Sequence, residues 1–135
     1  MTRYLLDANL ILRFLRDDHA ELSPKARALF AQAASGSCVL LISGVVLAEC
    51  VWVLRSYYKA DRELVALTLT KLISKPGVEA DEPALAVEAL SRMATTNADY
   101  ADCYLAARSA AHDHPVASFD KDFRKFKDIR RWEGV

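Results

Sequence analysis

The sequence predicts an α/β fold, specifically a three-layer α/β/α sandwich with a mostly parallel central sheet. Short apolar segments that are typical of strands alternate with longer segments of helical periodicity along the chain. The strand segments are apolar throughout instead of alternating with polar residues, which indicates strands covered on both faces. No internal repeat or long linker divides the 135 residues, a length typical of one domain. We therefore expect a single domain over residues 1–135.

The expected elements follow each other in a regular order. The strands are expected at residues 4–6, 38–42, 78–79 and 115–118, with a further strand around 131–132. The helices are expected at residues 9–15, 23–33, 43–57, 61–74, 83–94 and 99–111. Ser23 and Pro24 are expected to cap and open the second helix. The strand at 115–118 is expected to complete the sheet.

Composition excludes several classes of protein. Apolar residues make up 53% of the chain and charged residues 27%, the usual balance of a globular protein. The longest apolar stretch, 44–54, is interrupted by Glu49 and is much too short to span a membrane. The N-terminal residues lack the features of a signal peptide, and the three cysteines are isolated in apolar segments, so we expect a cytoplasmic protein. With a net charge of zero, any nucleic-acid site must be local, and the basic residues of 121–131 are a candidate.

Two aspartates stand where α/β proteins bind ligands. Asp7 and Asp120 each follow a predicted strand directly. In open α/β sheets, ligands bind beyond the carboxyl ends of the strands, so the two carboxylates are expected at one edge of the sheet. Each of them could instead cap the helix that follows it, and the sequence leaves both roles open.

Three further acids lie on predicted helices. Apolar residues surround Glu49 on every side of its helix, so we expect it to be buried. A buried carboxylate is costly unless it is hydrogen-bonded, paired with a base, protonated or bound to a metal. Asp99 and Asp102 stand three residues apart at a helix start and can share one face, Asp102 being the deeper. N-capping alone would explain Asp99.

A divalent cation would explain the convergence of these acids. At about 4 Å and an effective dielectric constant near 20, two carboxylates repel each other by roughly 4 kcal/mol. A bound cation removes this penalty, and an all-oxygen ligand set favours Mg²⁺ or Mn²⁺ over zinc.

Four segments together resemble the PIN domain, and more narrowly the VapC toxins of bacterial toxin-antitoxin pairs. These segments are 5–13, 46–49, 99–106 and 116–123, and the resemblance extends over essentially the whole chain. It implies an Mg²⁺- or Mn²⁺-dependent endoribonuclease. The residues that would hold the metal are Asp7, Glu49, Asp102 and Asp120, with Asn9, Asp99 and Ser118 in supporting roles.

The same resemblance implies partners. It implies a homodimer that acts on RNA and is silenced by a small VapB-like antitoxin. Trp52, Tyr57 and Tyr58 are a candidate contact region, although they could equally belong to the core. Arg13 recurs in similar sequences, and its role could be a salt bridge, a substrate contact or neither.

Two other functions are compatible with parts of the sequence but less so with the whole. A catalytically idle PIN-like binding module would be expected to have lost acids, and this chain keeps all four. A phosphotransferase with an aspartyl nucleophile at Asp7 would need a second carboxylate at position 9, which is Asn9. The chain has no P-loop, nucleophile elbow or dinucleotide-binding glycine pattern.

Overall fold

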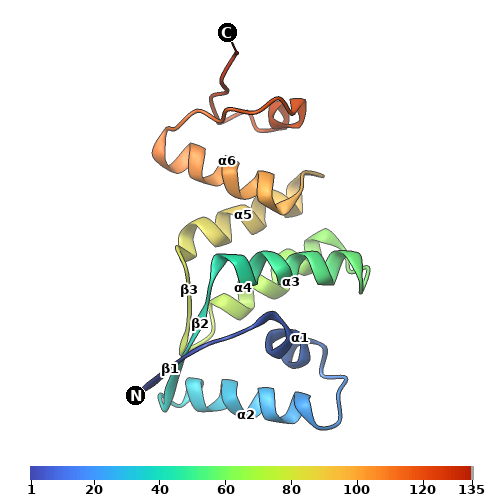
Figure 1. The fold of residues 1–135 in the computed structure, drawn as a ribbon, viewed down its shortest axis with the longest axis vertical. Helices are drawn as coiled ribbons and strands as arrows, with labels where there is room; N and C mark the ends of the chain where they lie inside the picture. The colour runs from blue at the N-terminus through green and yellow to red at the C-terminus, as the bar shows by residue number, and fades with distance from the viewer. Residues whose placement is uncertain (135) are drawn as a thin grey trace.

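The computed structural model describes residues 1–134, in which helices and strands alternate as the sequence predicts (Figure 1). The strands are β1 (Thr2–Leu5), β2 (Cys38–Ile42) and β3 (Val78–Ala80). The helices are α1 (Ala8–Arg16), α2 (Leu22–Ala34), α3 (Gly44–Ser56), α4 (Arg62–Ile73), α5 (Pro83–Thr95) and α6 (Tyr100–His112), followed by the short 3-10 helix η1 (Lys121–Lys125). No helix of the described chain has both the length and the apolar character needed to cross a membrane.

The three strands form one parallel sheet in the order β1-β2-β3. Thr2 pairs with Cys38 at the start of the first ladder, and Leu40 pairs with Val78 at the start of the second. Two helices connect each strand to the next, as parallel strands require a crossover. The predicted α/β class with a parallel central sheet is therefore confirmed.

The predicted fourth strand is wrong as a member of this sheet. Of residues 115–118, only Val116 is paired, in a single parallel bridge with Arg131. The strand expected around residues 131–132 is likewise reduced to this one bridge. The reason is that α6 packs chiefly on α5, so the segment that follows α6 is carried to the end of the long axis opposite β1 (Figure 1). β1 is left at an open edge, with all four of its residues exposed. The expected cover on both faces of the strands fails for β1.

The core lies between the sheet and the helices that follow β2. Leu40 and Ile42 of β2 are fully buried, together with Leu69 of α4 and Leu90 of α5. Each such side chain contributes about 1.5 to 3 kcal/mol by leaving water. Phe14 of α1 and Phe30 of α2 stack with their ring centroids 3.9 Å apart. This pair helps to join both helices to the core.

Ser23 has a different role from the predicted N-cap. α2 begins at Leu22, so Ser23 lies buried in the first turn, and its hydroxyl donates to the carbonyl oxygen of Arg13 at 2.7 Å. This hydrogen bond ties α2 to the end of α1. The prediction that Ser23 caps α2 was wrong, because its hydroxyl is used instead in the hydrogen bond to the Arg13 carbonyl oxygen of α1.

Side chains from the middle of the chain fix the C-terminal segment. The Arg92 guanidinium on α5 donates two hydrogen bonds to the carboxylate of Asp128, one of them 2.9 Å long. Arg130 donates to Asp113 at the end of α6 at 3.0 Å. Buried Phe123 packs into the core beside these pairs. The segment after α6 is therefore held on α5 and α6.

Candidate active site

Asp7 lies just beyond the carboxyl end of β1 and is the N-cap residue of α1. Its Oδ1 accepts a hydrogen bond from the backbone N–H of Leu10 at 2.9 Å, which satisfies one of the free donors at the helix start. The residue is nevertheless exposed. Asp7 therefore has the capping role, and its carboxylate also stays open to a ligand at the sheet edge.

The predicted burial of Glu49 is wrong, because this side chain is exposed. α3 buries Leu47 and Cys50 but leaves Val45 82% and Trp52 67% exposed on the face that also carries Glu49. Positions 45, 49 and 52 follow each other at the four- and three-residue spacing of one helix face. The sequence pattern could not reveal that this apolar face has no cover in the structure.

Asp7 and Glu49 form a first acidic group where α1 packs on α3. Both carboxylates act on the Cys50 thiol, whose pKa is raised to about 12 chiefly by burial and then by the charges of Glu49 and Asp7. The packing of α1 on α3 thus brings two acids that are 42 positions apart in the sequence to the same thiol. No base among residues 1–134 forms an ion pair with either carboxylate.

A second acidic group surrounds Asp102 in the first turn of α6. The pKa of Asp102 is raised by burial first, and then by the negative charges of Asp120, Asp99 and Asp122. Asp99 occupies the N-cap position of α6, but its side chain accepts no capping hydrogen bond. N-capping therefore does not account for Asp99. Asp122 was not predicted, and its only sequence signal was its position two residues after Asp120.

Local hydrogen bonds hold Asp120 in place. Its Oδ1 accepts from the backbone N–H of Asp122 at 2.8 Å, which caps η1. The hydroxyl oxygen of Ser118 accepts from the backbone N–H of Asp120 at 3.0 Å, and this hydrogen bond forms a turn just before η1. Asn9 lies exposed in the first turn of α1, close in sequence to Asp7.

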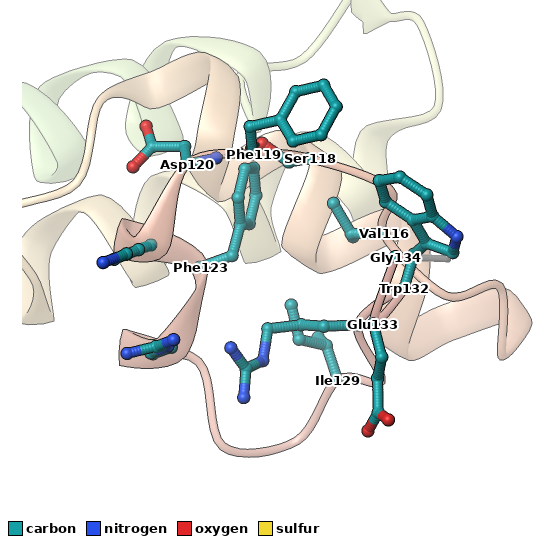
Figure 2. A pocket seen from close by; sticks show the side chains of 12 residues that line it. Val116, Ser118, Phe119, Asp120, Phe123, Ile129, Trp132, Glu133 and Gly134 are labelled. Carbon is teal, nitrogen blue, oxygen red and sulfur yellow. Dashed lines mark hydrogen bonds between the residues drawn. The ribbon is translucent and has the colours of Figure 1, made fainter.

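Asp120 borders a hollow of about 620 Å³ between the Val116 segment and the last residues described (Figure 2). Phe119, which is 93% exposed, and Trp132 stand at its rim with ring centroids 5.7 Å apart and planes at 70°. Three basic residues also line the hollow: Lys121, Arg124 and Arg131. Neither Phe119 nor Trp132 was predicted as a functional residue, although the position of Phe119 directly before the last acid was a possible signal.

The chemistry of these acids suits a hard divalent cation, but their arrangement in one chain does not. Carboxylate oxygens are the ligands that Mg²⁺ and Mn²⁺ prefer. Among residues 1–134, however, no three side chains of Asp, Glu, His or Cys gather closely enough to hold one ion. The first group contributes Asp7 and Glu49, and the second contributes Asp102 and Asp120. A single chain in this arrangement therefore supplies two partial sites.

The remaining residues singled out from the sequence also have defined positions. Arg13 lies 3.6 Å from Asp18, which supports the salt-bridge role among the three that were open. Trp52 and Tyr57 are exposed, so they do not belong to the core, whereas Tyr58 lies under the Arg16 guanidinium at 4.1 Å. A second hollow, of about 500 Å³, separates Trp52 on α3 from the start of α6.

A parallel sheet with the exposed carboxylate of Asp7 directly beyond the end of β1 defines an α/β protein with an acidic group at the edge where such sheets bind ligands. The chain belongs to the PIN domain family, whose model matches residues 4–129. PIN domains are generally nucleases, which hydrolyse nucleic acids, and they typically use divalent metal ions. No curated protein matches the sequence.

Proposed function

We propose that this protein is an Mg²⁺- or Mn²⁺-dependent endoribonuclease that acts as the toxin of a toxin-antitoxin pair in the cytoplasm. The observation that carries the proposal is the presence of four acids without an ion-pair partner among residues 1–134: Asp7, Glu49, Asp102 and Asp120. The pKa of Asp102 is raised by burial first and by the neighbouring acids second, so its negative charge opposes folding. A functional ligand is the simplest reason to keep the four acids.

The four carboxylates are the residues that would hold the metal. A divalent cation, when bound, would lower the pKa of water and stabilise negative charge on the phosphate. The nucleophile is water and not a side chain, and the products carry a 5′-phosphate and a 3′-hydroxyl. Ser118 keeps Asp120 oriented through its hydrogen bond to the backbone of Asp120. The capping bond to Leu10 does the same for Asp7.

The hollow beside Asp120 fits single-stranded RNA. Phe119 and Trp132 offer exposed ring faces on which unpaired bases can stack, a contact worth roughly 1 to 3 kcal/mol per base. Arg124 and Arg131 can bind phosphates next to them. Since the net charge of the chain is zero, this local basic and aromatic surface is the feature that favours RNA as substrate.

The exposed aromatic side chains of α3 and of the residue that follows it favour an antitoxin contact. Trp52 and Tyr57 are 67% and 75% exposed, and large exposed aromatics are enriched where proteins bind partners. We expect a VapB-like antitoxin to cover this surface. A short reading frame next to the gene, whose product co-purifies with this protein and blocks its activity, would support the toxin assignment. An idle PIN-like binding module remains the alternative.

The test is RNA cleavage measured with Mg²⁺, with Mn²⁺ and with EDTA. Asp7→Asn and Glu49→Gln should each lower cleavage by about 100-fold or more, because each removes a charge that positions the cation. Glu63→Gln is the matched control, since Glu63 is an equally exposed acid in the first turn of α4. It should leave the rate unchanged.

Two results would contradict the proposal. Cleavage that continues in EDTA and in the Asp7→Asn variant would exclude the acidic site. A pure protein that cuts no RNA with either metal, yet binds the antitoxin, would favour the idle module.

A further inference from the structure

β1 has a free backbone edge. The N–H of Leu6 donates to the carbonyl oxygen of Leu41 at 3.0 Å, so the backbone of residue 6 faces β2. Successive residues of a strand turn their backbone groups to opposite sides, so those of Leu5 point away from β2. Leu5 is also 78% exposed. The edge combines unpaired backbone groups with an apolar surface, a combination that pairs readily with another strand.

The segment around Val116 has a second free edge. The Val116 N–H donates to the carbonyl of Arg130 at 2.9 Å, and its carbonyl accepts from the Trp132 N–H at 2.8 Å. The backbone groups of Ala117 must then point to the other side, and Ala117 is exposed. One side of this segment is therefore paired and the other is open.

The two edges lie at opposite ends of the same chain. Figure 1 places β1 near one end of the long axis and the segment after α6 at the other. The Arg92–Asp128 and Arg130–Asp113 pairs hold the segment where it is. Within one copy the two edges do not meet. A second copy offers each edge the partner that it lacks.

The surfaces beside the two edges carry charged and apolar side chains that can interact. The surface at β1 and α3 carries Asp7 and Glu49, which no base of the described chain neutralises. The hollow beside Val116 is lined by three basic residues, Lys121, Arg124 and Arg131, against two acids, Asp120 and Glu133. Exposed apolar side chains occur on both surfaces, with Leu5 on one and Phe119 on the other.

We propose that two copies of this chain associate reciprocally, residues 116–118 of each copy adding a parallel strand to β1 of the other. Asp120 follows residue 118 by two positions, just as Asp7 follows the end of β1. Because parallel strands end at the same edge of a sheet, the pairing brings Asp120 of one copy to Asp7 of the other. Each complete acidic site then contains Asp7 and Glu49 of one copy with Asp102 and Asp120 of the second.

A disulfide test decides the association without measuring activity. Tyr4→Cys and Ala117→Cys, combined in one chain, place thiols at directly opposed positions of the two edges, because the register that brings Asp120 to Asp7 sets Ala117 opposite Tyr4. Opposed residues of adjacent strands have Cα separations within the range that a disulfide bridges, and their side chains lie on the same face. Cys38, Cys50 and Cys103 are buried and contribute little background. Oxidation should produce a covalent dimer on a denaturing gel. Each single variant, and Tyr4→Cys combined with Leu67→Cys on α4, should produce far less, since Leu67 is also exposed.

The outcome of this test is unambiguous. A covalent dimer specific to the double variant supports the reciprocal association. A disulfide within one chain would show that the segment closes on its own β1, and the absence of any specific disulfide would show that the edges never meet. Either of the last two results overturns the proposal.

A complementation test examines the composite site, and it rests on the proposed function. Asp7→Asn and Asp120→Asn are each inactive alone. In an equal mixture after subunit exchange, half of the dimers contain both variants, and each of these has one intact site, so about a quarter of wild-type activity should return. No recovery, with an active wild type, would overturn the composite site. An inactive wild type would refute the nuclease proposal, while the disulfide result would still decide the association.

Discussion

The Arg92–Asp128 pair provides the sharpest test of how the C-terminal segment is held. The perturbation is a double-mutant cycle with Arg92→Met, which keeps most of the aliphatic stem, and Asp128→Asn, which keeps the shape of the carboxylate. Arg92 is only 12% exposed and donates both hydrogen bonds to Asp128, which is 56% exposed. Arg92 also contacts Glu88 and the Phe126 ring, and the cycle cancels these contacts.

The expected coupling energy follows from the exposure of the two partners. A hydrogen bond to a charged group contributes about 1.5 to 3 kcal/mol when it is protected from water. Solvent screens the exposed oxygens of Asp128, and exposed ion pairs give only about 0.2 to 1 kcal/mol. Since Arg92 is ordered and its contact is bidentate, we expect a coupling near the top of that range, about 1 kcal/mol. For a chain of this length, that corresponds to roughly 3 to 5 °C in Tm.

The coupling energy between Arg92 and Asp128 should decrease as the pH falls. The hydrogen bonds from Arg92 lower the pKa of Asp128. A carboxylate whose folded pKa is depressed contributes stability above its unfolded pKa, about 3.9, and loses it as the pH falls through the folded value. Urea denaturation of the four proteins at pH 7 and at pH 2.5 measures both effects. Additivity within about 0.3 kcal/mol at pH 7, or a coupling that does not weaken in acid, would refute the reasoning.

Two further predictions concern the acids and one turn. Asp102→Asn should raise the Tm of metal-free protein at pH 7, because the pKa of Asp102 is raised and its charge therefore opposes folding. The gain in Tm should vanish below about pH 4, where the carboxyl group is protonated in both the folded and the unfolded chain. An unchanged or lower Tm at pH 7 would contradict this prediction. Gly77→Ala should cost about 2 to 4 kcal/mol in urea denaturation, since φ is +78° and the new Cβ would lie 2.3 Å from the Ala33 carbonyl oxygen. Gly36→Ala, at φ +86° with open space around it, should cost only about 1 kcal/mol, and equal losses would exclude the steric explanation.

Most of the fold could be predicted because it depends on local patterns. Apolar runs predicted β1 and β2, and helical spacing with capping residues such as Ser43 predicted all six helices. The 115–118 segment was predicted as a strand from equally good local evidence. The strand with which this segment can pair, however, depends on where α6 packs, and a local sequence pattern carries no information on the packing of α6. The error therefore concerns the tertiary position of the segment, and its extended Val116 does pair with Arg131.

The candidate site was predicted less completely, for a related reason. Asp7, Asp102 and Asp120 could be proposed from the sequence because acids beside strand ends and helix starts have a recognisable sequence context. The prediction that Glu49 is buried was wrong, because the apolar pattern of a helix indicates which of its faces could be covered by other elements but not which faces are covered. Phe119 was missed because an exposed aromatic residue looks the same as a buried one in a sequence.

The exposure of Glu49 and the open edge of β1 have one physical explanation. Both belong to the surface on which the proposed strand from a second copy would lie, so both remain uncovered in a single chain. The same contact would bring four carboxylates together, and each close pair repels by roughly 4 kcal/mol. Strand pairing and apolar burial therefore favour the association while the charges of the acids oppose it. A divalent cation between the two copies would neutralise that repulsion, so metal binding and assembly would stabilise each other.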